Sequence, residues 1–236
     1  MAFPDALLAQ QDEQEDAVKP VTRYTLRITP KERARIESEG RHVGETATAS
    51  ARVLQRRLET LRLAVGDISI SDAGEITLDL SGADHNARLS DALVHKGRLE
   101  FRLVETGAAD NTEILPVAGD LPPASVQTKV LMTGDAIRDA VPVVEPEWNG
   151  HVIVIRFDAE GQKEFGRISA ANVGKQLAIV LDGTIMSMPI IQEPVLGGTV
   201  QISGNFTQEE ANRLAISLAS GALPADLEIV SQMVVR

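Results

Sequence analysis

The stretch QLAIVLDGTIMSMPII, residues 176–191, decides how the second half of the chain folds. Its two apolar runs flank the dipeptide Asp182–Gly183. An Asp-Gly pair in this setting is a strong signal for a two-residue hairpin turn, because both turn residues need a positive φ that Asp and Gly tolerate. The stretch therefore predicts two antiparallel strands. Alternation along the second strand predicts that Met186 and Met188 share one face.

The residues after the hairpin predict a further strand, a capped helix and a closing strand. GGTVQISG (197–204) has the composition of a short strand after a turn. Thr207 and Glu210 match a capping box, in which each side chain bonds the backbone of the other residue at a helix start. We expect this helix to end at Gly221, and LEIVSQMVV (227–235) to form the closing strand.

The first half of the chain predicts the order β-α-β-β-α-β. The elements expected from hydrophobic spacing are a strand at 21–29, a helix at 47–65, a hairpin at 67–82, a helix at 84–97 and a strand at 98–105. Residues 30–46 are charged and contain two glycines, so we expect a loop with some helical character. The order of elements is typical of a split βαβ, ferredoxin-like sheet with helices on one face.

The middle of the chain has a different composition. Residues 106–125 are rich in Gly, Pro, Asp and Ala and predict a loop. VIVIRF (152–157) predicts a buried strand, and Asp158 after it predicts the N-cap of a helix over about 159–172. The sequence as a whole therefore predicts an α+β fold.

Composition and charge exclude several classes of function. Hydrophobic residues make up 43% and charged residues 24% of the 236 residues, which are ordinary globular values. The formal net charge of −11 argues against a nucleic-acid partner, because phosphate repels such a surface. The lack of Cys removes disulfides and thiolate chemistry. No apolar run approaches the roughly 18 residues of a spanning helix, and residues 1–19 are polar and acidic, so we expect a disordered tail.

No arrangement of residues predicts catalysis or metal binding. The four histidines share no metal-ligand spacing: His42, His85, His95 and His151. Ser187 and Ser203 lack the Gly-x-Ser-x-Gly elbow of a hydrolase nucleophile. Glu145 and Glu147 are candidates for an acid–base pair, but nothing else in the sequence converges on them. We expect no enzyme activity, no cofactor and no metal.

Met186, Met188 and Ile190 form the one candidate contact surface, since all three alternate along the expected strand. Core packing is the ordinary interpretation of such residues. The alternative is an adaptable apolar surface that accepts varied polypeptide partners, because the Met side chain is flexible and polarizable.

Residues 175–230 resemble SecD, the membrane subunit of the bacterial Sec translocon accessory complex, in its large first periplasmic region. The family's motifs occur here in the same order: Leu-Asp-Gly, Pro-Ile, Gly-Gly, Ile-Ser-Gly-Asn-Phe and Ala-Leu-Pro, at Leu181–Gly183, Pro189–Ile190, Gly197–Gly198, Ile202–Phe206 and Ala222–Pro224. Earlier segments match less tightly, so the resemblance covers about residues 47–230.

The resemblance implies a base and an inserted head. The base would be ferredoxin-like and built from residues 21–105 and 207–236, and the head would be a mixed α/β subdomain at 106–206. The family's head is expected to engage unfolded preprotein on the periplasmic side of the membrane and to swing relative to the base. Gly204 and Asn205, where the chain is expected to return to the base, are then candidate hinge residues.

The resemblance also implies partners and a location. We expect a periplasmic domain that inserts into no membrane itself and acts with Sec translocon membrane subunits such as SecF. The alternative is a structural or docking domain that binds a folded envelope partner. Residues 21–30 lack the Asp-Leu-Arg-Gly-Gly motif of the family, and the sequence stops at SQMVVR, where the family continues into membrane helices. We expect either an excised region or a stand-alone relative, and the missing motif favours the second.

Overall fold

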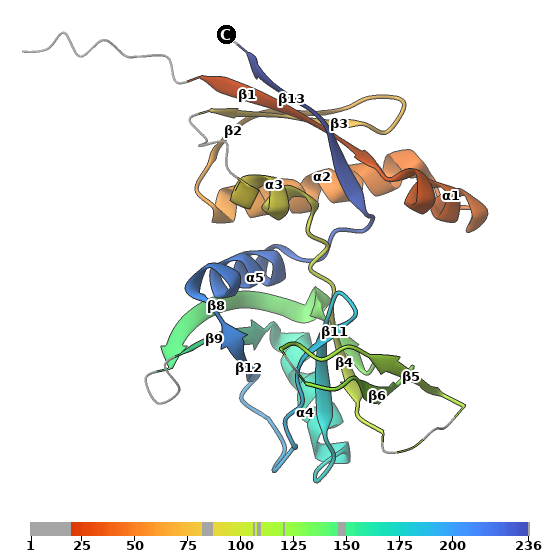
Figure 1. Cartoon of the computed structure of the whole chain (residues 1–236), viewed down its shortest axis with the longest axis vertical. Coiled ribbons are helices and arrows are strands. Elements are labelled where there is room, and N and C mark those ends of the chain that lie inside the picture. The colour runs from red at the N-terminus through yellow and green to blue at the C-terminus, as the bar shows by residue number, and fades with distance from the viewer. Residues whose placement is uncertain are drawn as a thin grey trace, which may run out of the picture.

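The chain forms two stacked units (Figure 1). The computed structural model describes residues 20–81, 87–105, 107, 110–119, 121–145 and 150–235. The upper unit in Figure 1 holds the first and last strands, and the lower unit holds the middle of the chain. Each unit has its own buried core, so the protein is a mixed α/β chain with two packing centres. Within the described residues, no helix has both the length and the apolar character needed to cross a bilayer.

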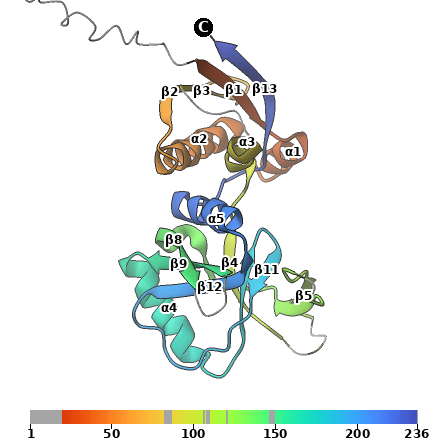
Figure 2. The same cartoon turned by 60° about the vertical axis from the view of Figure 1, so that its left-hand side comes forward.

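The upper unit is a four-stranded sheet with helices on one face (Figures 1 and 2). The strand order is β13-β1-β3-β2, and each neighbouring pair is antiparallel. Its elements are β1 (Val21–Ile28), α1 (Pro30–Ser38), α2 (Val43–Thr60), β2 (Ala64–Ile70), β3 (Ile76–Ser81), α3 (Ala87–Val94) and β13 (Leu227–Val235). Alternation along β1 buries Tyr24 and Leu26 in the core, while Arg23 on the other face pairs with Asp79.

The lower unit combines three small sheets with two helices. The strand orders are β11-β10-β4-β7, β12-β9-β8 and β5-β6. Its strands are β4 (Leu99–Leu103), β5 (Thr112–Leu115), β6 (Ala124–Gln127), β7 (Met132–Thr133), β8 (Ile137–Glu145), β9 (Gly150–Phe157), β10 (Leu177–Leu181), β11 (Thr184–Ser187) and β12 (Thr199–Phe206). Its helices are α4 (Ala159–Ala171) and α5 (Gln208–Ser220), with a short 3₁₀ turn η1 (Gly134–Ala136).

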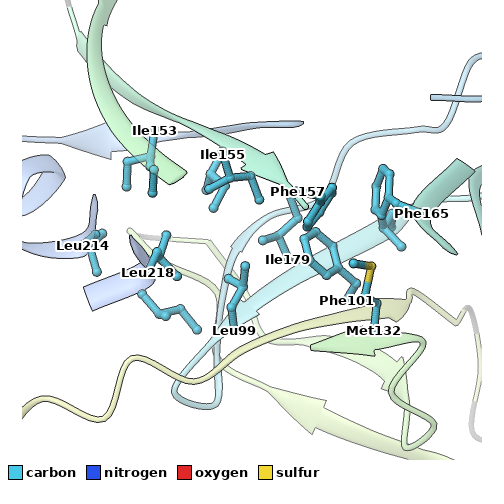
Figure 3. Packing of buried hydrophobic residues seen from close by; sticks show 14 of the residues in the cluster. Leu99, Phe101, Met132, Ile153, Ile155, Phe157, Phe165, Ile179, Leu214 and Leu218 are labelled. Carbon is cyan, nitrogen blue, oxygen red and sulfur yellow. The ribbon is translucent and has the colours of Figure 1, made fainter. Parts of the chain in front are cut away.

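The lower core joins segments that are far apart in the sequence (Figure 3). The rings of Phe101, Phe157 and Phe165 lie with centroids 5.1–5.9 Å apart, in edge-on or tilted pairs. Such pairs add about 0.5–1.5 kcal/mol to the burial of the rings. Leu214 and Leu218 of α5 enter the same core from the side of the upper unit (Figures 1 and 3). The last helix is thus part of the lower core.

Local predictions that depend on adjacent residues are confirmed. The β2–β3 and β10–β11 hairpins form where the turns were expected. Asp158 precedes α4, and its carboxylate accepts the N–H of Gly161 at 2.7 Å. The capping box is complete: Thr207 Oγ1 accepts the N–H of Glu210, and the Glu210 carboxylate accepts the N–H of Thr207 at 2.9 Å.

Two elements lie in a different unit from the one expected. The base was predicted to contain the strand at 98–105 and the helix after Thr207. Instead β4 pairs with β10 in the lower unit, and the apolar stripe of α5 belongs to the lower core. Both faces of β4 are covered, since Leu99, Glu100 and Phe101 are all buried. A strand covered in this way takes an interior place in a sheet, as β4 does between β10 and β7.

Two predicted loops contain regular structure. Residues 106–125, expected to be a loop, include β5 and the start of β6, which form a two-stranded ribbon. Residues 30–46 include α1 and the first turn of α2. Pro30 is compatible with a helix start, because the N–H that proline lacks would have no partner in the first turn.

Candidate functional site

The turn between β10 and β11 ties the hairpin to the segment that joins the two units. Its residues Asp182 and Gly183 have φ of 48° and 81°, as the predicted two-residue turn requires. The Asp182 carboxylate accepts three hydrogen bonds, from the N–H of Gly97 (3.0 Å), the N–H of Arg98 (2.7 Å) and Nδ1 of His95 (2.9 Å). Burial alone would raise the pKa of Asp182, but these bonds outweigh it and lower the pKa below its ordinary value.

Met186 and Met188 point to opposite faces of the sheet, which corrects the predicted shared face. Two adjacent residues of β10, Ile179 and Val180, pair with Ser187 and Ile185 of β11. Met186 is therefore an extra residue, and such a β-bulge shifts the two-residue alternation by one position. Met186 packs against the main lower core, whereas Met188 packs against a second, smaller cluster.

This smaller cluster, called the side cluster below, is an apolar core beside the β10–β11 hairpin. Its buried members are Val117, Val126, Ala178, Val180 and Ile185. Met188 is half-buried against it, and Ile190, two residues further on, is 62% exposed. The backbone of this segment is fixed, because Gln176 Nε2 donates to the carbonyl of Met188 (2.9 Å) and Leu177 N–H donates to that of Pro189 (2.8 Å). Met188 and Ile190 thus present apolar surface on a held backbone.

Sequence analysis missed other exposed apolar side chains of the lower unit. Those at least 40% exposed, besides Ile190, are Ile114, Leu121, Val143, Val144, Val173 and Leu196. Val143 and Val144 lie on β8, an edge strand of its sheet. A β-branched run that contains a proline, as in VPVV (141–144), is the signal that could have found this edge, because proline in sheets is confined to edges and bulges.

The candidate hinge residues Gly204 and Asn205 lie within β12. They fall in the irregular part of its pairing with β9, between Ile202 and Phe206. Gly204 is required there, because a Cβ atom would stand 2.7 Å from the Phe206 ring. The hinge prediction assumed that the chain enters the base directly after these residues. Since α5 belongs to the lower core, both residues stand inside the lower unit, and their hinge role stays a prediction.

The described residues among those considered for chemistry do not converge. The described histidines stand apart: His42 before α2, His95 between α3 and β4, and His151 in β9. His85 and Glu147 fall outside the described residues, so the proposed carboxylate pair with Glu145 is not described. Over the ranges that the structure describes, no group of three or more His, Asp or Glu side chains is placed to hold a metal ion.

Known proteins match both the lower unit and the chain as a whole. Residues 112–225 match the family model described as the P1 head subdomain of SecDF. The protein translocase subunit SecD of Syntrophobacter fumaroxidans is 33% identical over 219 residues, which is 82% of this chain. The chain belongs to the SecD family. It spans 41% of the length of that SecD relative, and the P1 head match extends past α5, in agreement with the packing of this helix in the lower unit.

Two solved SecDF structures share the fold. One, described as SecDF in a super-membrane-facing form, has a TM-score of 0.72 and 26% identity, over 92% of this chain and 30% of its own. The other, described as a membrane component SecDF that enhances protein export, has a TM-score of 0.69 and 26% identity. It is matched over 98% of its length by 89% of this chain, so its extent corresponds closely to that of the two units together.

Proposed function

We propose that this chain is a non-catalytic, periplasmic domain of the SecD type that assists protein export by binding unfolded preprotein as it emerges from the Sec translocon. Family membership supports this role, because the relatives are named translocase subunits and a matching SecDF is described as enhancing protein export. A binder of many unfolded chains needs accessible apolar surface and free strand edges, and it needs no catalytic group.

The apolar surface formed by half-buried Met188 and exposed Ile190 is the observation that carries the proposal. Met188 packs against the side cluster, and Ile190 follows two residues later on a backbone fixed by hydrogen bonds. A flexible Met side chain adapts to different apolar partners, and Ile190, which is 62% exposed, gains about 1–2 kcal/mol when a partner buries the exposed part of its side chain. A preprotein segment that crosses this surface would therefore bind through side chains of many kinds, as export of varied cargo requires.

The two units correspond in this proposal to a base and a head. The antiparallel order β13-β1-β3-β2 with helices on one face supports a ferredoxin-like base in the upper unit. The lower unit would be the head that meets the preprotein. Membrane subunits of the translocon, including a SecF-like protein, would be the partners of the larger assembly.

Binding to a permanently unfolded, reduced and alkylated model protein tests the proposal. Ile190→Asp should weaken binding by about tenfold, since it removes apolar burial worth about 1–2 kcal/mol and about 1.4 kcal/mol corresponds to a tenfold change in affinity. Val234→Asp on β13 is the matched control, because Val234 is also 62% exposed but lies in the upper unit. Met188→Asp combined with Ile190→Asp should abolish the remaining binding.

Two results would count against this function. The first is an intact chain that retains its circular dichroism spectrum and binds no unfolded polypeptide. The second is that Ile190→Asp and Val234→Asp weaken the binding of the unfolded protein equally, which would show that the surface at Ile190 has no special role in binding. Stoichiometric capture of one folded envelope protein, without any unfolded client, would support the docking alternative instead.

A further inference from the structure

Only two segments of the described chain cross between the upper and lower units (Figures 1 and 2). The first crossing, residues 95–98, joins α3 to β4. The second crossing, residues 221–226, joins α5 to β13. The two crossings are bonded to each other, since Leu223 N–H donates to the carbonyl of Lys96 at 2.8 Å. Whatever holds these segments also sets how the lower unit sits on the upper one.

Arg57 of α2 holds both crossings from the side of the upper unit. Its side chain is completely buried. The guanidinium donates to five oxygen atoms: the carbonyls of Ala92, His95, Lys96 and Gly221, and Ser220 Oγ. Burial lowers the pKa of Arg57 to about 10, so the group remains charged at neutral pH. The planar guanidinium has five N–H donors in a fixed arrangement, so one Arg side chain can donate hydrogen bonds to both crossings at once.

Asp182 holds the first crossing from the side of the lower unit. As described above, its carboxylate accepts the N–H groups of Gly97 and Arg98 and Nδ1 of His95. The crossing is therefore bonded through its carbonyls to Arg57 and through its N–H groups to Asp182. The backbone N–H of Asp182 adds one more bond, to the carbonyl of Arg98 at 2.9 Å.

The two sides of this arrangement differ in their access to water. Arg57 has no exposed surface, whereas the Asp182 side chain is 24% exposed. Asp182 also lines a surface hollow of about 470 Å³ beside the crossing, together with Lys96, Arg98 and Asp226. Water in this hollow can replace the hydrogen bonds of Asp182 at small cost, whereas the bonds of Arg57 have no such substitute.

We propose that Arg57 and Asp182 form a two-sided clamp on the crossings, in which Arg57 is a permanent pivot and Asp182 is a releasable latch. With Asp182 engaged, the β10–β11 hairpin is tied to the first crossing and the lower unit has one orientation. When Asp182 disengages, the lower unit turns about residues 95–98 and 221–226 while both crossings remain bonded to Arg57. The inference is independent of what the surface at Ile190 binds.

A distance measurement between the units tests the latch. Because the chain contains no Cys, cysteines introduced by Glu37→Cys on α1 and Val173→Cys after α4, both exposed, carry two spin labels without interference. Asp182→Asn preserves the positive φ of the turn, since Asn tolerates this region as well as Asp. It removes the charge and places an amide group among the three donors. We expect the distance distribution to broaden or to gain a second population.

Asp226→Asn is the matched control. Asp226 is a carboxylate at the same junction that pairs with Lys96 at 2.8 Å, but it does not hold the first crossing to the hairpin. An unchanged distribution in Asp182→Asn, or the same broadening in Asp226→Asn, would overturn the latch. His95→Gln provides a second variant that leaves the β10–β11 turn intact and removes one of the three bonds, and it should broaden the distribution to a smaller extent. A distribution for His95→Gln equal to that of the unmodified chain would also contradict the proposal.

Discussion

Replacing Arg57 by Met should destabilise the protein far more than replacing the preceding residue, Arg56, by Met. Five hydrogen bonds from a charged donor, at the low value of about 1.5 kcal/mol each, amount to roughly 7 kcal/mol. The lowering of the Arg57 pKa from its ordinary value to about 10 corresponds to a burial cost of about 3 kcal/mol, which Met would not incur. The expected loss is therefore about 4 kcal/mol. This loss of about 4 kcal/mol is a lower limit. The value per hydrogen bond already includes the cost of removing the donor from water, so subtracting the burial cost counts part of that cost twice.

Urea denaturation at pH 7, followed by circular dichroism, measures this loss. Arg56→Met is the control, because Arg56 precedes Arg57 on α2 but is exposed, and such surface changes stay within about 0.5 kcal/mol. Arg57→Lys should fall between the two, since an ammonium has three donors instead of five and cannot reach both crossings at once. If Arg57→Met and Arg56→Met differed by less than about 1 kcal/mol, the role of Arg57 as a hydrogen-bonded pivot would be wrong.

Three further changes have defined outcomes. The lowered pKa of Asp182 means that its carboxylate stabilises the fold above the ordinary value of about 4, and this contribution is lost as the pH falls below it. The difference in unfolding free energy between the unmodified chain and Asp182→Asn should therefore be smaller at low pH than at pH 7. Phe165→Ala should cost about 3–5 kcal/mol in urea unfolding, because Phe165 is 2% exposed and contacts two other rings, whereas Val173→Ala should have little effect. Thr207→Ala should cost about 1 kcal/mol and raise amide hydrogen exchange in the first turn of α5, because it removes the acceptor for the Glu210 N–H.

Elements decided by neighbouring residues could be predicted from the sequence. The turn at Asp182–Gly183, the cap at Asp158 and the capping box at Thr207 each depend on a few adjacent residues whose backbone preferences are strong. The strand β8 was not predicted, and its run VPVV (141–144) contains Pro142, which indicates either an edge strand or no strand at all. In the structure β8 is an edge strand of its sheet. An edge strand tolerates proline, because only one of its sides pairs with another strand of the sheet.

Features decided by distant partners could not be predicted. The alternation of β4 shows that it is a strand but does not show which sheet receives it, and the apolar stripe of α5 fits either core equally well. The bulge at Met186 depends on the pairing of β11 with β10, and it shifts the two-residue alternation, so that Met188 packs against a different cluster from Met186. Asp182 was identified as a turn residue, but its hydrogen bonds to residues 95–98 arise only because β10 pairs with β4, which brings the turn next to the first crossing.

The packing of α5 also decides where a turning motion between the units would occur. Its apolar stripe is buried in the lower core: Ala211, Leu214, Ala215 and Leu218. Burial of each Leu is worth about 1.5–3 kcal/mol. On the upper side, Ser220 Oγ at the end of α5 accepts one hydrogen bond from Arg57 (3.1 Å). The ion pair of Arg213 with Asp91 has both side chains at least 41% exposed, and such pairs contribute at most about 1 kcal/mol. Because α5 is held more strongly to the lower unit than to the upper one, it would move with the lower unit. For such a motion we expect bending after α5, at residues 221–226, and the hinge role of Gly204 and Asn205 stays a prediction.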